Sequence, residues 1–442
     1  MRRFWTVVLV SAPLAAQSPL SLKDAIRMGL EKHPAVEASK AGEAQAESRI
    51  RQARSGHLPK LNYAESYQRS NNPVFVFSSL LTQHQFTEQN FRIDTLNRPD
   101  ALNNFQSQLT VDQPLYDAGQ TRQAVRSANL MRSMAGETVR RTDIDVIMNI
   151  TRAYYGAVLA AENLKVAEAS VKSAQADLER AEAVRGAGMA TDADVLSIRV
   201  HLASVREQQI RAANDVEVAR AALNDALGVP LDTRFDLSTP LSPAQLAAPQ
   251  LEQFEKEAVE ARPEARQAAL AGSLAETQAA AARSSLLPQV MFRGAFEADR
   301  QRFVTRGGAN WFAGVSLRWN LFNGFADKAR IEEAVAAERQ ARAQKQRAES
   351  GIRLQVRKAY LDLKAAQERL DVTAAAVAQA EESQRIIQNR YQNGLTTVTE
   401  LLRSETALLA ARTRRLAAIH DQRIAAATLL ESTGTLNKDS DL

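Results

Sequence analysis

Cysteine is absent from the 442 residues of this chain, and histidine is scarce. Without cysteine there is no disulfide, no thiolate nucleophile, no cysteine-ligated metal and no lipid anchor on an N-terminal cysteine. No two histidines have the spacing that places two metal ligands on one helix face. We therefore expect no metal site and no cofactor. The five histidines are His33, His57, His84, His201 and His420.

A strong excess of one charge is also missing. The formal net charge is +5, and Lys and Arg alternate with Asp and Glu along stretches of helical composition. This pattern is typical of solvated helix faces, whereas nucleic-acid-binding proteins gather basic residues into patches. We expect no nucleic-acid partner.

Long apolar runs are missing after the N-terminus. Arg2 and Arg3 precede a short apolar segment, residues 4–10, and Leu14-Ala15-Ala16 follows as a small-residue cleavage site. This order predicts a secretory signal peptide over residues 1–17 that is removed from the mature protein. Beyond it no run of 18 apolar residues occurs, so we expect no transmembrane helix. A mature protein that enters a membrane must then use strands.

The chain contains an internal duplication. Leu58-Pro59 recurs as Leu287-Pro288, 229 positions later, and Gly188 recurs as Gly394, 206 positions later. The smaller offset means that the first half carries an excess of 23 residues between Pro59 and Leu115. The predicted organisation is a first repeat over 18–228, a linker over 229–250, a second repeat over 251–434 and a tail over 435–442.

Proline is missing from residues 115–229 and from everything after Pro288. Because proline breaks helix interiors, these blocks are free to form long helices, and they are rich in helix-favouring residues. We predict helices over about 119–185, 192–227, 326–392 and 398–432. The longest would reach about 100 Å and need neighbours along their whole length. Apolar residues every seven positions predict coiled-coil packing, as in Val356, Leu363, Leu370 and Val377, whose repeat partners are Ile150, Ala157, Leu164 and Val171.

Four segments alternate between apolar and polar residues, over about 61–70, 104–114, 289–299 and 310–320. In the last of these, Trp311, Val315 and Leu317 oppose Ser316 and Arg318. Segments of about ten residues with one apolar face are typical of membrane β-barrel strands. A sheet on a soluble core is the competing interpretation for any single strand. That interpretation requires an apolar layer that covers all four strands, and the chain offers none because its helices pack on one another.

Four strands do not close a barrel. Unpaired edge groups in lipid cost several kcal/mol each, so closure must come from other copies of the chain. Two copies would give eight strands and three would give twelve, and the pattern alone permits either. The excess residues of the first repeat fall within 70–104, which we expect to form an extended hairpin loop outside the cell.

Several motifs together resemble the TolC-like outer-membrane factor family over residues 20–436. They are the duplicated plan, the Xaa-Pro helix starts at Pro34 and Pro263, and the Leu-Pro pairs before each strand pair. The strand exits 114–119 and 320–324 also fit, and the helix turns 185–196 and 390–402 are the most specific match. The resemblance implies a mainly α fold in which long antiparallel coiled-coil helices form an α-barrel. It also implies a homotrimer whose four strands per chain build a 12-stranded β-barrel.

The resemblance also implies roles for the two helix turns. They would form the periplasmic tip and dock a periplasmic adaptor (a membrane fusion protein) of an inner-membrane pump. The resemblance further implies a gate at this tip. Asp194 and Tyr391 align with the pair of residues that latches the gate in the family, and Glu400 aligns with one of its acidic rings. Arg403 departs from the family, which commonly has an acid there. The predicted docking residues are Gly188, Met189, Ala190, Thr191, Gly394, Leu395, Thr396 and Thr397. Glycine permits the chain reversal at each turn, and Met189 and Leu395 offer apolar contacts.

The sequence thus indicates an outer-membrane exit duct that carries substrate passively from an inner-membrane pump across the periplasm. It lacks a phosphate-binding loop and any recognisable catalytic motif, so we expect no enzyme activity. The alternative is a periplasmic coiled-coil adaptor or scaffold protein. Such a protein would need no amphipathic strands at matching positions of two repeats.

Overall fold

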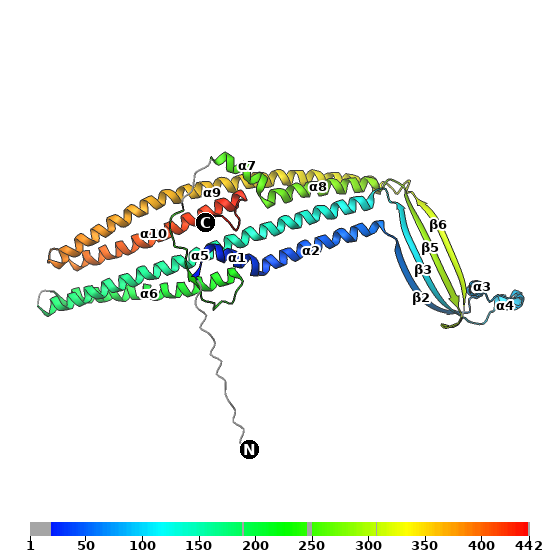
Figure 1. Ribbon diagram of the computed structural model, residues 1–442, viewed down its shortest axis with the longest axis horizontal. Helices are drawn as coiled ribbons and strands as arrows, with labels where there is room; N and C mark the ends of the chain where they lie inside the picture. Colours follow the sequence, from blue (N-terminus) through cyan, green and yellow to red (C-terminus); the bar gives the residue numbers. More distant parts are fainter. Residues whose placement is uncertain (1–18, 188–189, 245–249, 306, 441–442) are drawn as a thin grey trace, which may run out of the picture. The chain divides into compact units, whose positions relative to one another are not determined.

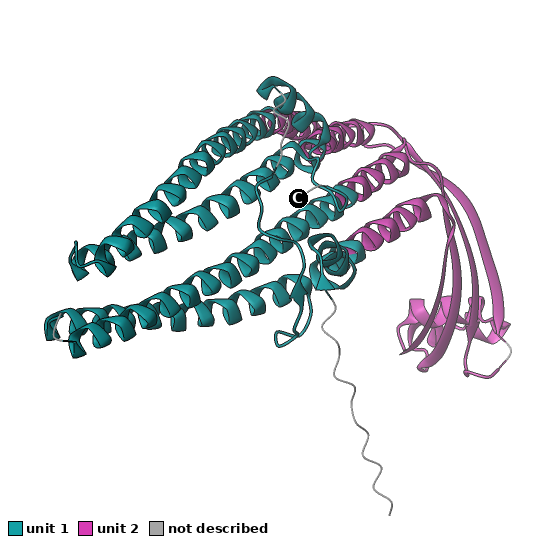
Figure 2. Ribbon diagram, turned by 60° about the vertical axis from the view of Figure 1, so that its left-hand side comes forward, with its two compact units in different colours: residues 1–41, 136–266, 346–442 teal, residues 42–135, 267–345 magenta. Residues whose placement is uncertain are grey.

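A computed structural model describes residues 19–187, 190–244, 250–305 and 307–440. The predicted signal peptide and the predicted tip residues Gly188 and Met189 lie outside the described residues. The chain divides into two compact units (Figure 2). Unit 1 comprises residues 1–41, 136–266 and 346–442, and unit 2 comprises residues 42–135 and 267–345.

Helices make up most of the described chain (Figure 1), and the predicted mainly helical fold is confirmed. No described helix is both long and apolar enough to cross a membrane. In chain order the helices are α1 (Leu22–Lys32), α2 (Pro34–Arg54), η1 (Ser55–His57), α3 (Pro73–Thr82), η2 (Glu88–Phe91), α4 (Ile93–Asn97), α5 (Gln120–Gly186), α6 (Asp192–Leu227), α7 (Leu251–Ala261), α8 (Pro263–Ser284), α9 (Ala326–Gln392) and α10 (Val398–Thr433).

The duplication is visible in the helix lengths and in the helix ends. α5 and α9 contain 67 residues each, and α6 and α10 contain 36 each. α6 ends at Gly228 and α10 at Gly434, both with positive φ, the conformation that glycine adopts most easily. A Cβ at Gly228 would crowd the backbone of His33, and one at Gly434 the backbone of Arg262. In each repeat, the glycine that ends the 36-residue helix therefore lies close to the backbone of another segment.

The predicted heptad positions face inward. Val356, Leu370, Val377, Ile150 and Ala157 are buried, while Leu363, Leu164 and Val171 are half-buried. Neighbouring helices therefore shield these side chains, as the seven-residue spacing requires.

Unit 2 contains one antiparallel sheet with the strand order β2-β3-β5-β6. Its strands are β2 (Lys60–Ser70), β3 (Leu102–Tyr116), β5 (Gln289–Arg300) and β6 (Gly308–Arg318). In the register, Gln108 lies opposite Glu297, and Glu297 lies opposite Asn310. One residue along, Leu109 lies opposite Phe296, and Phe296 opposite Trp311. Because side chains alternate across a sheet, one face is largely polar and the other largely apolar.

The segment between β2 and β3 corrects an expectation. The sequence predicts an extended hairpin loop over 70–104, but this segment forms α3, η2 and α4. Asn72 caps α3 by accepting hydrogen bonds from the N–H groups of Val74 and Phe75, at 3.0 and 3.2 Å. Pro73 occupies the first helical position, where its missing N–H has no cost. An Asn-Pro pair, which is typical of a turn, therefore begins a helix here.

Unit 1 is organised around a buried tyrosine. The hydroxyl of Tyr154 on α5 donates to the carbonyl of Leu20 (2.8 Å) and accepts from the N–H of Thr239 (2.9 Å). Leu20 belongs to β1 (Pro19–Leu20), which pairs in parallel with β4 (Asp236–Leu237). Tyr154 thus ties the start of the first repeat and the linker between the repeats to the same helix.

Replacing Tyr154 with phenylalanine should lower the melting temperature of the purified protein. The change leaves the Thr239 N–H without its partner, at a cost of about 1–3 kcal/mol. It also removes one of two donors to the Leu20 carbonyl, the other being the N–H of Ser238 at 3.1 Å. Tyr155→Phe is the matched control, because that hydroxyl is buried and has no hydrogen-bond partner among the residues that the structure describes. Thermal denaturation followed by intrinsic fluorescence measures both. Equal shifts for the two variants would contradict this role of the Tyr154 hydroxyl.

Candidate functional site

The turn between α5 and α6 carries the first set of predicted site residues. Thr191 is the N-cap of α6, and its hydroxyl accepts a hydrogen bond from the N–H of Asp194 (3.2 Å). The Asp194 carboxylate reaches back to the N–H (3.1 Å) and the hydroxyl (2.7 Å) of Thr191. This is a capping box, which satisfies free N–H groups at a helix start. Ala190, another predicted docking residue, lies directly before the cap.

The turn between α9 and α10 follows the same plan. Gly394 has a φ of +71°, and the N–H of Leu395 donates to the carbonyl of Arg390 (2.8 Å), as in a helix end closed by a left-handed residue. Thr397 caps α10 by accepting from the N–H of Glu400. Thr396 is half-buried, whereas the Leu395 side chain is 66% exposed. The turn therefore presents an apolar side chain to its surroundings.

The two helical hairpins pack on each other through an apolar cluster. Val195, Ile198 and Leu202 of α6 are buried in it. From the second hairpin Val398 is buried in the same cluster, and Tyr391 packs against it. The two turns are thus parts of one structural region within unit 1.

The predicted gate residues fall into two pairs. Asp194 lies close enough to Tyr391 to help raise the pKa of the tyrosine, although burial of its ring is the larger cause. Among the described residues no hydrogen bond joins them, because the carboxylate is turned to Thr191. Glu400 pairs instead with Arg403 on the same helix, at 2.8 Å. Glu400 and Arg403 are three positions apart in the sequence, a spacing that brings side chains together on a helix.

Sequence reasoning missed a buried polar cluster beneath these turns. Asp177 of α5 is 1% exposed and forms an ion pair with Arg180, at 3.0 Å. Glu405 of α10 lies 3.2 Å from the imidazole Nε2 of His201 of α6, and it accepts a hydrogen bond from Ser173 at 3.1 Å. Three helices from both repeats therefore contribute to one buried charged group, which we call the acid cluster: Ser173, Asp177, Arg180, His201 and Glu405.

Two sequence signals could have pointed to the acid cluster. Asp177 lies between Ala174 and Ala181, which are both buried and seven residues apart, so it occupies an apolar seam. The duplication is also broken there. The repeat counterpart of Asp177 is Ser383, and that of Glu405 is Arg199. The coiled-coil design that the two repeats share does not explain an acid that only one repeat carries at such a position.

The carboxyl groups of the acid cluster have opposite pKa shifts. Burial raises the pKa of Asp177 to about 7, and the Glu405 carboxylate adds to the rise. Burial opposes ionisation of Glu405 as well, but hydrogen bonds with His201, Asp177 and Ser173 outweigh it and lower the pKa of Glu405. At neutral pH the cluster therefore holds one ionised acid and one that is partly protonated.

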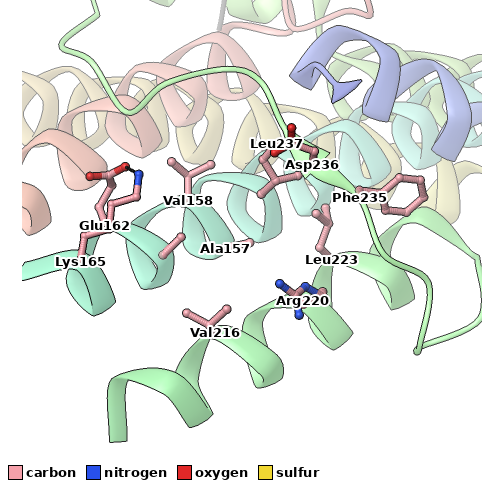
Figure 3. Close-up of a pocket in the computed structure, with 11 residues that line it drawn as sticks. Ala157, Val158, Glu162, Lys165, Val216, Arg220, Leu223, Phe235, Asp236 and Leu237 are labelled. Atoms are coloured by element: carbon pink, nitrogen blue, oxygen red, sulfur yellow. Dashed lines mark hydrogen bonds and ion pairs between the residues drawn. The ribbon is translucent and has the colours of Figure 1, made fainter. Parts of the chain in front are cut away.

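Elsewhere in unit 1, a cavity of about 270 Å³ lies between α5, α6 and the segment at β4 (Figure 3). Val158, Leu223 and Phe235 supply apolar walls. Glu162 and Lys165 line it as well and pair with each other at 2.7 Å. Across the described ranges, no three His, Asp or Glu side chains are grouped so as to hold a metal ion.

The acid cluster should make stability depend on pH. An acid whose pKa is higher in the folded than in the unfolded chain weakens folding once it must ionise. For Asp177 this loss grows as the pH rises from its ordinary value of 3.8 through about 7. Asp177→Asn should therefore raise the melting temperature relative to the unmodified protein, and more at pH 8 than at pH 5. Asp192→Asn, at an exposed acid paired with Arg185, is the control. Parallel curves for the unmodified and Asp177→Asn proteins would contradict the assignment.

Comparison with known proteins agrees with this geometry. A family model described as "Outer membrane efflux protein" matches residues 25–229 and 256–435. Protein CyaE of Bordetella pertussis is 27% identical over 347 residues, which cover 77% of this chain and 73% of that protein. Alkaline protease secretion protein AprF of Pseudomonas aeruginosa is 28% identical over 238 residues, 52% of this chain and 46% of AprF.

The fold is that of solved outer-membrane proteins. The structure of VceC from Vibrio cholerae superposes with a TM-score of 0.76 at 19% identity, over 93% of this chain and 96% of that chain. The family match extends over both repeats and includes both helical turns. The chain therefore belongs to the outer membrane efflux protein family.

Proposed function

We propose that three copies of this chain form a continuous exit duct, with a 12-stranded barrel in the outer membrane and a helical tunnel in the periplasm. Substrate reaches this duct from an inner-membrane pump through a periplasmic adaptor. As a family member the chain is an outer-membrane efflux protein. Beyond family membership, we propose the trimer, the adaptor and the pump. The observation that carries the proposal is the pair of free edges of the sheet.

Each edge strand has a partner on one side only. β2 pairs with β3, and β6 pairs with β5, and the sheet continues no further in the described chain. Since the four strands alternate in direction, β6 of one copy is oriented to meet β2 of the next copy in antiparallel fashion. Closure by identical copies satisfies every edge N–H and C=O group, which hydrocarbon would otherwise leave unpaired.

The faces of the sheet support a barrel in lipid. Trp311 is 80% exposed, and Val315 and Leu317 are exposed on the same face. A broad exposed apolar face is unfavourable in water and favourable in hydrocarbon. The opposite face, with Gln108, Glu297 and Asn310, then lines the lumen.

The helical turns support docking of an adaptor. Leu395 presents an apolar side chain, and Thr397 and Thr191 hold the two helix starts in place. A partner that grips these turns and prefers one arrangement of the hairpins would shift the duct between closed and open states. AprF is named as a protease secretion protein, which favours an exported protein as the substrate. The duct needs no chemistry of its own, since the pump supplies the energy.

The proposal predicts an outer-membrane oligomer. Expressed with its signal peptide, the protein should fractionate with outer membranes. Without heating it should migrate in denaturing gels as a species of three chains, and boiling should convert it to one chain, because edge pairing closes the barrel. A soluble monomer would contradict the duct and favour the coiled-coil scaffold.

The proposed latch can be tested by conductance. Asp194→Ala combined with Tyr391→Ala should raise single-channel conductance in planar bilayers, because it removes the Tyr391 ring that packs between the hairpins and the neighbouring carboxylate that we assign to the latch. Thr191→Ala is the matched control: it removes the N-cap hydroxyl but keeps the Asp194 carboxylate. If the control raises conductance as much as the double variant, helix capping explains the effect and the latch assignment is wrong.

A further inference from the structure

The insertion between β2 and β3 is a folded module. The ring centroids of Phe77 and Phe86 lie 4.9 Å apart, and those of Phe86 and Phe91 lie 5.1 Å apart. Val76 of α3 is buried. Aromatic rings at these separations stabilise one another edge to face. Figure 1 shows α3 and α4 at the end of the sheet where β2 stops and β3 begins.

Hydrogen bonds fasten the end of α3 to the sheet. The side-chain amide of Gln83, the residue that follows α3, donates to the Asn103 carbonyl (2.9 Å) and to Asn104 Oδ1 (2.8 Å). Asn104 Nδ2 in turn donates to Asp299 Oδ1 (2.6 Å). Gln83, Asn104 and Asp299 are all buried. Buried polar groups are costly to separate from their partners, so these three hydrogen bonds favour one arrangement of the end of α3 on the sheet.

A second contact joins α3 to β6. Asn310 Nδ2 donates to the carbonyl of Thr82, the last residue of α3, at 3.2 Å. A Cβ at Gly308 would overlap that same carbonyl oxygen, so only glycine permits the approach. The end of α3 is therefore anchored to β3, β5 and β6 at once.

These anchors all lie on the polar face of the sheet. Asn104, Gln106 and Gln108 are every second residue of β3 and therefore lie on one face of it. Asp299 lies opposite Gln106, and Asn310 lies opposite Glu297. In the duct proposed above, on which this inference rests, the polar face lines the lumen. The module is then held over the extracellular mouth from inside the barrel.

The module leaves an apolar stripe uncovered. Val74, Phe77 and Leu81 recur at three- and four-residue spacing, on the side of α3 opposite Val76. Val74 and Leu81 are 77% and 47% exposed, and Phe77, whose ring also packs against Phe86, is 36% exposed. Ile93 at the start of α4 is 75% exposed. Such a stripe at a water-filled mouth is unfavourable unless another surface covers it.

We propose that the stripe of Val74, Phe77 and Leu81 packs against the same module of the neighbouring copies, and that three modules together close the extracellular mouth as a lid. The occupant is a second copy because the stripe is carried by a segment anchored to β6, the strand whose free edge must itself meet the next copy. Threefold symmetry places three copies of the apolar surface around one axis, where each can be covered by its neighbours.

Cysteine crosslinking tests the lid directly, because the chain has no cysteine of its own. Leu81→Cys should give covalent dimers with a short bis-maleimide in intact outer membranes, because each chain then offers one thiol. Glu88→Cys, an exposed polar position of the same module, is the matched control and should crosslink far less. Equal yields at the two positions would overturn the stripe as the contact.

Permeability supplies the second readout. Val74→Asp combined with Leu81→Asp places like charges between the modules and should raise single-channel conductance and the uptake of a large hydrophilic antibiotic several-fold. Unheated gels separate the two possible failures. An intact trimer without Leu81→Cys crosslinks and with unchanged conductance overturns the lid but leaves the duct. A protein that forms no trimer overturns both.

Discussion

Unpaired backbone groups at a sheet edge have no partner in hydrocarbon, and each costs several kcal/mol. The sheet of this chain has two such edges, along β2 and β6. An even number of alternating strands gives these edges opposite directions, so identical copies can join without a parallel pair. The need to close the sheet thus accounts for the proposed oligomer, for the apolar face and for the polar face of the sheet. In the proposed duct, it also means that one chain is insufficient.

The duplication supplies two similar hairpins that have since diverged in their polar residues. Thr191 and Thr397 cap equivalent helices, and Asp194 and Glu400 follow them at the same spacing. Asp194 completes a capping box, whereas Glu400 pairs with Arg403. An acid at this position therefore serves helix capping in one repeat and a helix-surface ion pair in the other. Any role in the gate is added to these local roles.

The acid cluster and the lid arise where the two repeats differ. Asp177 and Glu405 have no charged equivalent of the same sign in the other repeat, and the module over 71–101 has no counterpart between β5 and β6. Shared positions serve the common scaffold of seams, caps and strands. Positions that differ are free to supply a pH-sensitive contact in unit 1 and the proposed lid in unit 2.

The helices, the strands and the duplication could be predicted from sequence patterns, because they follow from local rules. Missing prolines permit long helices, seven-residue spacing buries Val356 and Val377, and period-two alternation defines the two faces of β6. The contact of Gln83 with Asn104 and the approach of Asp177 to Glu405 depend on how the elements pack and could not be predicted in this way. Those pairs join residues far apart in the chain, and no periodicity records which polar side chains meet once helices and strands have packed.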